Sequence, residues 1–145
     1  MDKEAIPKRE EVPFSWMLRS QFATKKNLDT MFRFFGARRV LPALYYIRPL
    51  LMGSNLLDVR EAFDSIHSWE EWIDSWSRVG EKREIYARIA LEDSRPVSAR
   101  DNYIYASAAY QMAQFPLYDD VDRRRMIYEK SAECYRYAAS LLSPP

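Results

Sequence analysis

The sequence predicts an all-α fold: an antiparallel helical bundle or set of hairpins behind an irregular, aromatic-rich N-terminal section. Three observations predict it. Apolar residues recur at three- and four-residue steps through three long segments in the second half of the chain, as on one face of a helix. No segment shows the alternation of apolar and polar residues that marks a half-buried strand. Only 3 glycines occur in 145 residues, so turns must be few or built with proline.

The two ends of the chain differ in composition from its middle. Residues 1–13 combine charged residues with prolines and contain no apolar core of a signal peptide, so they predict a flexible leader. Residues 14–142 carry enough apolar and aromatic residues for a single α-helical domain with its own core. Residues 143–145 read Ser-Pro-Pro and predict the start of a linker.

The aromatic-rich section at the start of this domain is predicted to contain only short helical pieces. Asn27 or Asp29 is expected to cap a helix that Gly36 ends, because short polar side chains favour helix starts and glycine favours helix ends. Pro42 and Pro49 lack the backbone N–H that a helix interior needs, so they keep the following helical pieces short.

The first long helix is predicted to start after Ser68 and to end before Pro96. The Ser68 hydroxyl can accept a hydrogen bond from a first-turn N–H, and the carboxylates of Glu70 and Glu71 favour the positive end of the helix dipole. Gly80 lies inside the helix, where it either costs about 1 kcal/mol relative to alanine or lets another element approach. The residues at helical steps are Trp69, Trp72, Trp76, Val79, Arg83, Tyr86 and Ala90.

The second long helix is predicted from Ser98, its expected cap, to about Phe115, because Pro116 pushes the preceding residue out of helical geometry. Asp101 lies three residues after Ser98, where a capping box carries a glutamate. One face alternates large and small side chains, which favours close packing against neighbouring helices on more than one side. Its members are Ala99, Tyr103, Ala106, Tyr110 and Ala113.

The third long helix is predicted to open with Asp119, Asp120 and Asp122. These carboxylates suit a helix N-terminus better than a calcium site, because no glycine-bearing loop or distal carboxylate accompanies them. The basic run from Arg123 to Arg125 is expected to face solvent, since no base-stacking aromatic residues are interleaved with it. The expected inner face consists of Val121, Ile127, Ser131, Cys134, Ala138, Leu141 and Leu142.

Composition argues against several partners. The net charge is +1, so the chain has no basic excess for binding nucleic acid. The most apolar stretch, VLPALYYIRPLLMG, is too short for a membrane span and is interrupted by prolines and an arginine. The single cysteine, Cys134, cannot form a disulfide within the chain, which favours a reducing compartment. We therefore expect a cytoplasmic protein that binds neither nucleic acid nor membranes.

The residue inventory also argues against several chemistries. The widely spaced glycines cannot form a Gly-x-Ser-x-Gly elbow or a phosphate-binding loop. One cysteine and one histidine, His67, are too few for a zinc site. Cys134 lies on an apolar helical face, which favours a structural thiol over a nucleophile paired with His67. We therefore expect no metal, no cofactor and no catalytic residue in this chain.

The last two thirds of the sequence carry a distinctive pattern of tryptophan, tyrosine and alanine. Its members are Trp72, Trp76, Ala99, Tyr103, Ala106, Ala108, Tyr110, Ala113, Phe115, Tyr128, Ser131, Cys134, Tyr135 and Ala138. The pattern resembles the N-terminal helical cap, or lid, of a group of α/β-hydrolases that includes 2,6-dihydroxypseudooxynicotine hydrolase and the fungal polyketide-shortening pigment hydrolases. The resemblance covers residues 58–145 and, more loosely, residues 14–57. It departs at Asp93 and Ser94, because a glycine is common there in those caps.

The resemblance implies that the catalytic serine, acid and histidine belong to an α/β-hydrolase core, present in cis or in trans. It implies hydrolysis of an ester or a β-diketone C–C bond in a polyketide-like or aromatic, hydrophobic small molecule, and a capacity to form a homodimer. The cap would shape the substrate pocket. Its substrate-binding residues would then be Trp76, Tyr103, Tyr110 and Phe115, although aromatic residues at this spacing are also typical of a helical core.

Two other functions fit the same residues. The alanine and tyrosine pattern of the last two long helices, followed by Pro144, is also typical of a helical-hairpin interaction module of the tetratricopeptide type, although such modules stack at least three repeats. Alternatively, the rings could line a ligand cavity in a small stand-alone α-helical enzyme. Turnover by the isolated chain would distinguish this enzyme from a cap.

Overall fold

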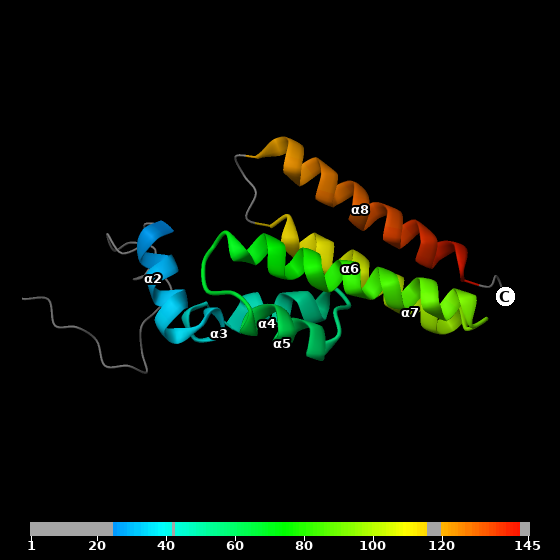
Figure 1. Cartoon of the computed structure of the whole chain (residues 1–145), viewed down its shortest axis with the longest axis horizontal. Helices are drawn as coiled ribbons and strands as arrows, with labels where there is room; N and C mark the ends of the chain where they lie inside the picture. The colour runs from blue at the N-terminus through cyan, green and yellow to red at the C-terminus, as the bar shows by residue number, and fades with distance from the viewer. Residues whose placement is uncertain (1–24, 42, 116–119, 143–145) are drawn as a thin grey trace, which may run out of the picture.

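The computed structural model describes residues 25–41, 43–115 and 120–142, and every regular element in these ranges is a helix (Figure 1). This confirms the predicted all-α fold. The helices are α2 (Lys25–Phe35), α3 (Ala37–Val40), α4 (Ala43–Leu51), α5 (Leu56–Asp64), α6 (Glu71–Glu92), α7 (Pro96–Ala113) and α8 (Val121–Ser140). The expected leader, residues 1–13, and the expected linker start, residues 143–145, lie outside the described residues.

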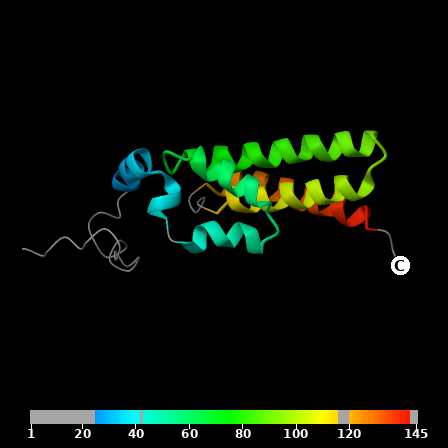
Figure 2. The same ribbon diagram turned by 90° about the horizontal axis from the view of Figure 1, so that it is seen from below.

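The three long helices form the antiparallel bundle that the sequence predicts. α7 packs most extensively on α6 and next on α8, while α4 and α5 lie along α6 and α7 on the side away from α8 (Figure 1, Figure 2). This central position explains why α7 buries side chains on several faces, and why most of them are small. The buried residues of α7 are Ala99, Tyr103, Ala106, Ser107, Ala108, Ala109, Tyr110, Met112 and Ala113.

Of the three long helices, α8 begins as the sequence predicts, and α6 begins two residues later than predicted. α6 begins at Glu71, and the Ser68 hydroxyl accepts a hydrogen bond from the Glu71 N–H at 3.2 Å. α8 begins after Asp120, whose carboxylate accepts a hydrogen bond from the Arg123 N–H at 3.0 Å. α7 begins at Pro96, two residues before the predicted cap, because a proline at the first helical position has no N–H to be satisfied.

The predicted cap of α7 is therefore wrong. Ser98 lies in the first turn of the helix, and its carbonyl accepts a hydrogen bond from the Asn102 side-chain amide at 2.9 Å. Asp101 does not complete a capping box. Its carboxylate accepts hydrogen bonds from the guanidinium of Arg100 at 2.8 and 2.9 Å.

The turn from α6 to α7 contains the two residues at which the sequence departs from the hydrolase caps it resembles. Ser94 has a φ of 56°, in the left-handed region that glycine adopts most easily. The Ser94 N–H donates to the Leu91 carbonyl at 3.0 Å, and the Arg95 N–H donates to the Ala90 carbonyl at 2.7 Å. This is the hydrogen-bond pattern of a Schellman motif, so Ser94 occupies the position at which glycine usually ends a helix.

The N-terminal section consists of short helices, as predicted, although its helix starts were predicted poorly. Asn27 and Asp29 both lie inside α2, so neither is at the start of that helix. The Asp29 carboxylate instead accepts a hydrogen bond from the Trp69 N–H at 2.6 Å. Gly36, with a φ of 75°, follows the last residue of α2 as expected. α5 was not predicted at all, although its cap, Asn55, accepts a hydrogen bond from the Leu57 N–H at 2.8 Å.

Gly80 is a point of close approach between α6 and α7. A Cβ atom built at this position would lie only 2.8 Å from two ring carbons of Tyr110. The ring cannot move aside easily, because it is buried and its hydroxyl donates a hydrogen bond to the Glu84 carboxylate. Of the two explanations that the sequence allowed for this glycine, the structure supports close packing.

We expect the substitution Gly80→Ala to destabilise the protein in spite of the better helix propensity of alanine. Propensity favours the variant by about 1 kcal/mol, whereas overpacking a rigid buried contact costs about 1–3 kcal/mol. The sign should reverse in a Tyr110→Ala background, where the ring is gone and alanine should stabilise α6 by about 1 kcal/mol. Urea unfolding of the four proteins measures both effects, and an equal effect of alanine in both backgrounds would show that the ring is not the obstacle.

Candidate functional site

Trp76 and Phe115, two of the sequence-predicted site residues, lie at two ends of one aromatic cluster. Trp76 is fully buried, and its ring centroid lies 6.1 Å from that of Phe63 and 6.1 Å from that of Trp72. Phe115, just after α7, is partly buried and meets the edge of Tyr45 at 5.7 Å. Tyr45 lies 6.3 Å from Trp72 and so links the two ends. Both predicted residues therefore pack mainly against other rings.

Tyr103 and Tyr110, the other two predicted site residues, lie at the contact between α7 and α8. Tyr103 is buried and stacks on Tyr137 with ring centroids 5.2 Å apart. Tyr110 is buried, and the Lys130 ammonium lies 5.2 Å from its ring centroid. Burial, together with the hydrogen bond to Glu84, raises the pKa of the Tyr110 phenol above its ordinary value. Tyr110 therefore stays protonated at neutral pH.

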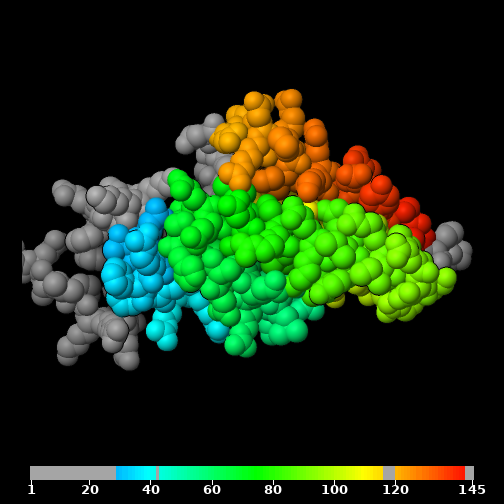
Figure 3. Space-filling view, viewed as in Figure 1, coloured from blue at the N-terminus to red at the C-terminus, as the bar shows by residue number. Residues whose placement is uncertain are grey.

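An open groove of about 520 Å³ runs between α6 and α8, and Tyr110 borders it. In Figure 3 it follows the boundary between the green and the orange helix. Two ion pairs span it: Arg123 lies 2.9 Å from Asp74, and Lys130 lies 3.7 Å from Glu81. The lining is mostly charged, with Asp74, Ser77, Glu81, Tyr110, Arg123, Met126, Ile127, Glu129, Lys130 and Glu133. Because the groove is open and two ion pairs cross it, it does not enclose a small molecule as a binding pocket does.

A buried charge network joins α5, α6 and α7, and sequence reasoning missed it. The Asp58 carboxylate accepts two hydrogen bonds from the Arg83 guanidinium, from Nε at 2.6 Å and from Nη2 at 2.9 Å. Arg83 also donates to the Asn102 side-chain oxygen at 2.9 Å, and its guanidinium lies 5.0 Å from the Tyr105 ring centroid. Lys82 adds a second cation 3.5 Å from Asp58. The network has no unpaired group with which to act as an acid or base.

Cys134 shows no sign of reactivity. The thiol is buried, and this burial raises its pKa to about 12, with the Glu84 and Glu133 carboxylates adding to the effect. Among the described residues, no cluster of three or more histidine, cysteine or acidic side chains has the geometry to hold a metal ion. None of the described helices is both long and apolar enough to cross a membrane.

Several large apolar residues are exposed on α4, α5 and the turn between them, and we call this region the α4–α5 surface. Leu44, Ile47 and Leu51 follow three- and four-residue steps along α4, so they project from one face of that helix. Leu51 is 79% exposed, and Leu57, in the first turn of α5, is 69% exposed. The exposed large apolar residues of the α4–α5 surface are Leu44, Ile47, Leu51, Met52, Leu56 and Leu57. Clustered exposure of this kind marks an interaction surface.

Comparisons of the chain with protein-family models, with curated proteins and with solved structures found no match.

Proposed function

We propose that the chain is a helical cap that packs on an α/β-hydrolase core and helps to enclose its active site. The observation that carries the proposal is the α4–α5 surface, because a cap must present apolar side chains where it meets its core and substrate. The tryptophan, tyrosine and alanine pattern that resembles hydrolase caps builds the α6–α7–α8 bundle behind this surface, where it provides a rigid support.

In this proposal the core supplies the nucleophilic serine, its base and the oxyanion-hole donors. The cap excludes water from the reaction and provides apolar walls for an ester or β-diketone substrate. Trp76, Tyr103 and Tyr110 are buried and contact neighbouring side chains, so they position the helices. The contacts with core or substrate fall instead to the exposed side chains of the α4–α5 surface, such as Leu51 and Leu57.

The proposal predicts that the chain binds a separately expressed α/β-hydrolase core from the same genome and restores its turnover of an aryl ester or a β-diketone. Isothermal titration measures binding, and an esterase assay measures turnover. The paired substitution Leu51→Asp and Leu57→Asp should weaken binding at least about tenfold, because it places charges in an apolar contact. Both side chains are exposed, so the fold should persist by circular dichroism.

A matched control is Val97→Asp, which adds a charge at a residue of α7 that is 60% exposed and lies outside the α4–α5 surface. Binding should be unchanged in this variant. The proposal is wrong if the α4–α5 variant binds and activates the core as well as the control does. Saturable ester hydrolysis by the isolated chain would also contradict it and would favour the stand-alone enzyme.

A further inference from the structure

A second exposed apolar strip runs along α8, separate from the α4–α5 surface. Val121, Tyr128, Tyr135 and Leu142 are spaced by seven residues and are 63%, 54%, 64% and 57% exposed. Positions seven apart differ by about 20° around a helix, so Val121, Tyr128 and Tyr135 lie on one side of α8, and Leu142 follows two residues after its last residue. We call these four residues the α8 stripe. The sequence predicted Val121 and Leu142 on the inner face of this helix, and this was wrong. The inner face is formed by Ile127, Ser131, Cys134 and Ala138.

The order of residue types in the α8 stripe is the same from either end. It carries an aliphatic residue at each end and a tyrosine at each of the two inner positions. Ala132 lies between the tyrosines, four residues after Tyr128, where a small side chain permits close approach of a second helix. An interface related by a two-fold axis requires such self-complementarity, because each patch must meet a copy of itself.

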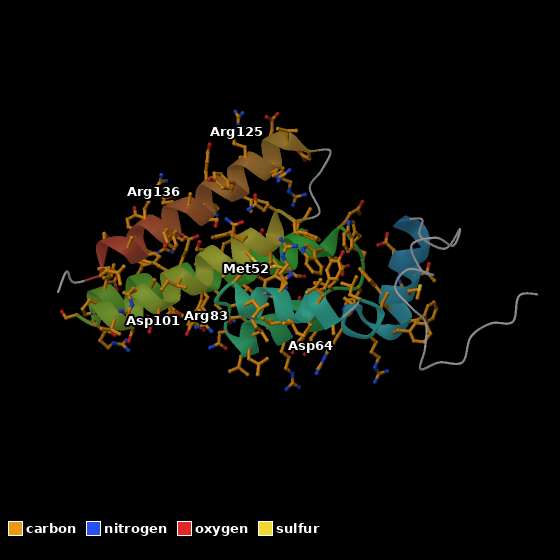
Figure 4. The ribbon with its side chains drawn as sticks, turned by 180° about the vertical axis from the view of Figure 1, so that it is seen from behind. Met52, Asp64, Arg83, Asp101, Arg125 and Arg136 are labelled. Carbon is orange, nitrogen blue, oxygen red and sulfur yellow. The ribbon has the colours of Figure 1, made fainter. Side chains whose placement is uncertain are left out.

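The charges on α8 are placed for a partner that runs in the opposite direction. Arg124 and Arg125 lie near the N-terminal end, where the helix dipole disfavours cations, and neither makes an ion pair within the described residues. The last turn of α8 has no basic residue to meet its carbonyl groups. In an antiparallel pair, these two arginines lie beside the last turn of the partner, where cations are favoured. Arg125 and Arg136 extend away from α7, in agreement with this placement (Figure 4).

We propose that two copies of the chain associate through their α8 stripes as an antiparallel, two-fold symmetric dimer. Tyr128 of each copy then packs against Tyr135 of the partner subunit, and Val121 lies near Leu142 of the partner subunit. This inference is independent of the proposed cap function, because it uses a different surface and leaves the α4–α5 surface uncovered.

The size of the stripe sets the expected strength of the dimer. Two half-exposed tyrosines and two half-exposed aliphatic residues bury on the order of 700 Å² over both copies when they are covered. This area is below the approximately 1,200 Å² of a standard interface. We therefore expect a reversible dimer with a dissociation constant of roughly 10–100 µM.

Sedimentation over a range of concentrations tests the association with the full chain. The paired substitution Tyr128→Glu and Tyr135→Glu should weaken the dimer at least about tenfold. The matched control is Ile85→Glu with Ile89→Glu, because these α6 residues are 46% and 44% exposed and do not belong to the α8 stripe. The control should dimerise like the unaltered chain. The proposal is overturned if the chain stays monomeric up to about 500 µM, or if both variants lose the dimer equally. It is also overturned if the tyrosine substitutions weaken only the binding of the hydrolase core and leave dimerisation unchanged.

Cross-linking tests the orientation. Val121→Cys and Leu142→Cys are prepared as separate proteins, and the native Cys134 does not compete because it is buried. In an antiparallel dimer the two variants form a disulfide with each other when they are mixed, and neither links to itself. Self-linked Val121→Cys would instead indicate a parallel pair and would contradict the proposed geometry.

Discussion

Asp58→Ala is expected to lower the free energy of unfolding by about 3–5 kcal/mol, among the largest effects of any single substitution in this protein. The Asp58 side chain is 3% exposed and the Arg83 side chain is 15% exposed, so the ion pair between them is largely shielded from water. Removing the carboxylate leaves the guanidinium buried without its anion, and Lys82 keeps only its pairing with Glu61. Urea unfolding followed by tryptophan fluorescence measures the loss.

Two further variants distinguish the loss of the ion pair from a general effect of shortening an acidic side chain on α5. Asp64→Ala removes an exposed carboxylate that pairs with Arg60 at 3.5 Å, and it should cost less than about 1 kcal/mol. The double variant Asp58→Leu with Arg83→Met replaces both charges by apolar groups, and it should recover most of the stability lost in Asp58→Ala. If Asp58→Ala were no worse than Asp64→Ala, the buried pair would not be what holds α5 against α6.

The network around Asp58 and Arg83 also shows which part of the fold could not be predicted from the sequence. The long helices could be predicted because each carries its own signal: apolar periodicity, first-turn carboxylates and an end marked by proline or a turn. α5 is only 9 residues long, and its stability comes from partners on other helices, such as Arg83. An acidic residue that binds an arginine 25 positions away leaves no local pattern. The one local signal that could have indicated this helix is Asn55, whose side chain caps it, and the sequence prediction did not use it.

The predicted site residues illustrate a second limit. Aromatic residues at helical spacing are required both for a tightly packed core and for the wall of an apolar pocket, so the spacing alone cannot distinguish the two. Burial distinguishes a core residue from a pocket residue: Trp76 and Tyr110 are buried and contact neighbouring side chains. The exposed apolar residues of the α4–α5 surface gave no comparable signal, because a run of leucines around two prolines is equally typical of a buried helix.

Trp72→Ala is expected to destabilise the protein by about 3–5 kcal/mol, comparable with the loss of Asp58. Trp72 is fully buried, and its ring lies 5.5 Å from Phe63 and 5.6 Å from Trp69, so the substitution opens a cavity in the middle of the aromatic cluster. For a chain of this size such a loss lowers the melting temperature by about 10–15 °C. Differential scanning calorimetry gives this shift directly.

The conservative variant Trp72→Phe shows whether Trp72 stabilises the fold through its ring volume or through its hydrogen bond. The indole Nε1 donates a hydrogen bond to the Met112 carbonyl at 2.8 Å, which joins the start of α6 to the end of α7. Phenylalanine keeps much of the ring volume but loses this hydrogen bond. If the ring volume contributes most of the stability, Trp72→Phe should lower the free energy of unfolding by about 1–2 kcal/mol. Trp76, whose Nε1 has no hydrogen-bond partner among the described residues, is the matched comparison, and Trp76→Phe should cost less. Equal losses in the two phenylalanine variants would show that the hydrogen bond to Met112 contributes little, and that the cluster is held by ring packing alone.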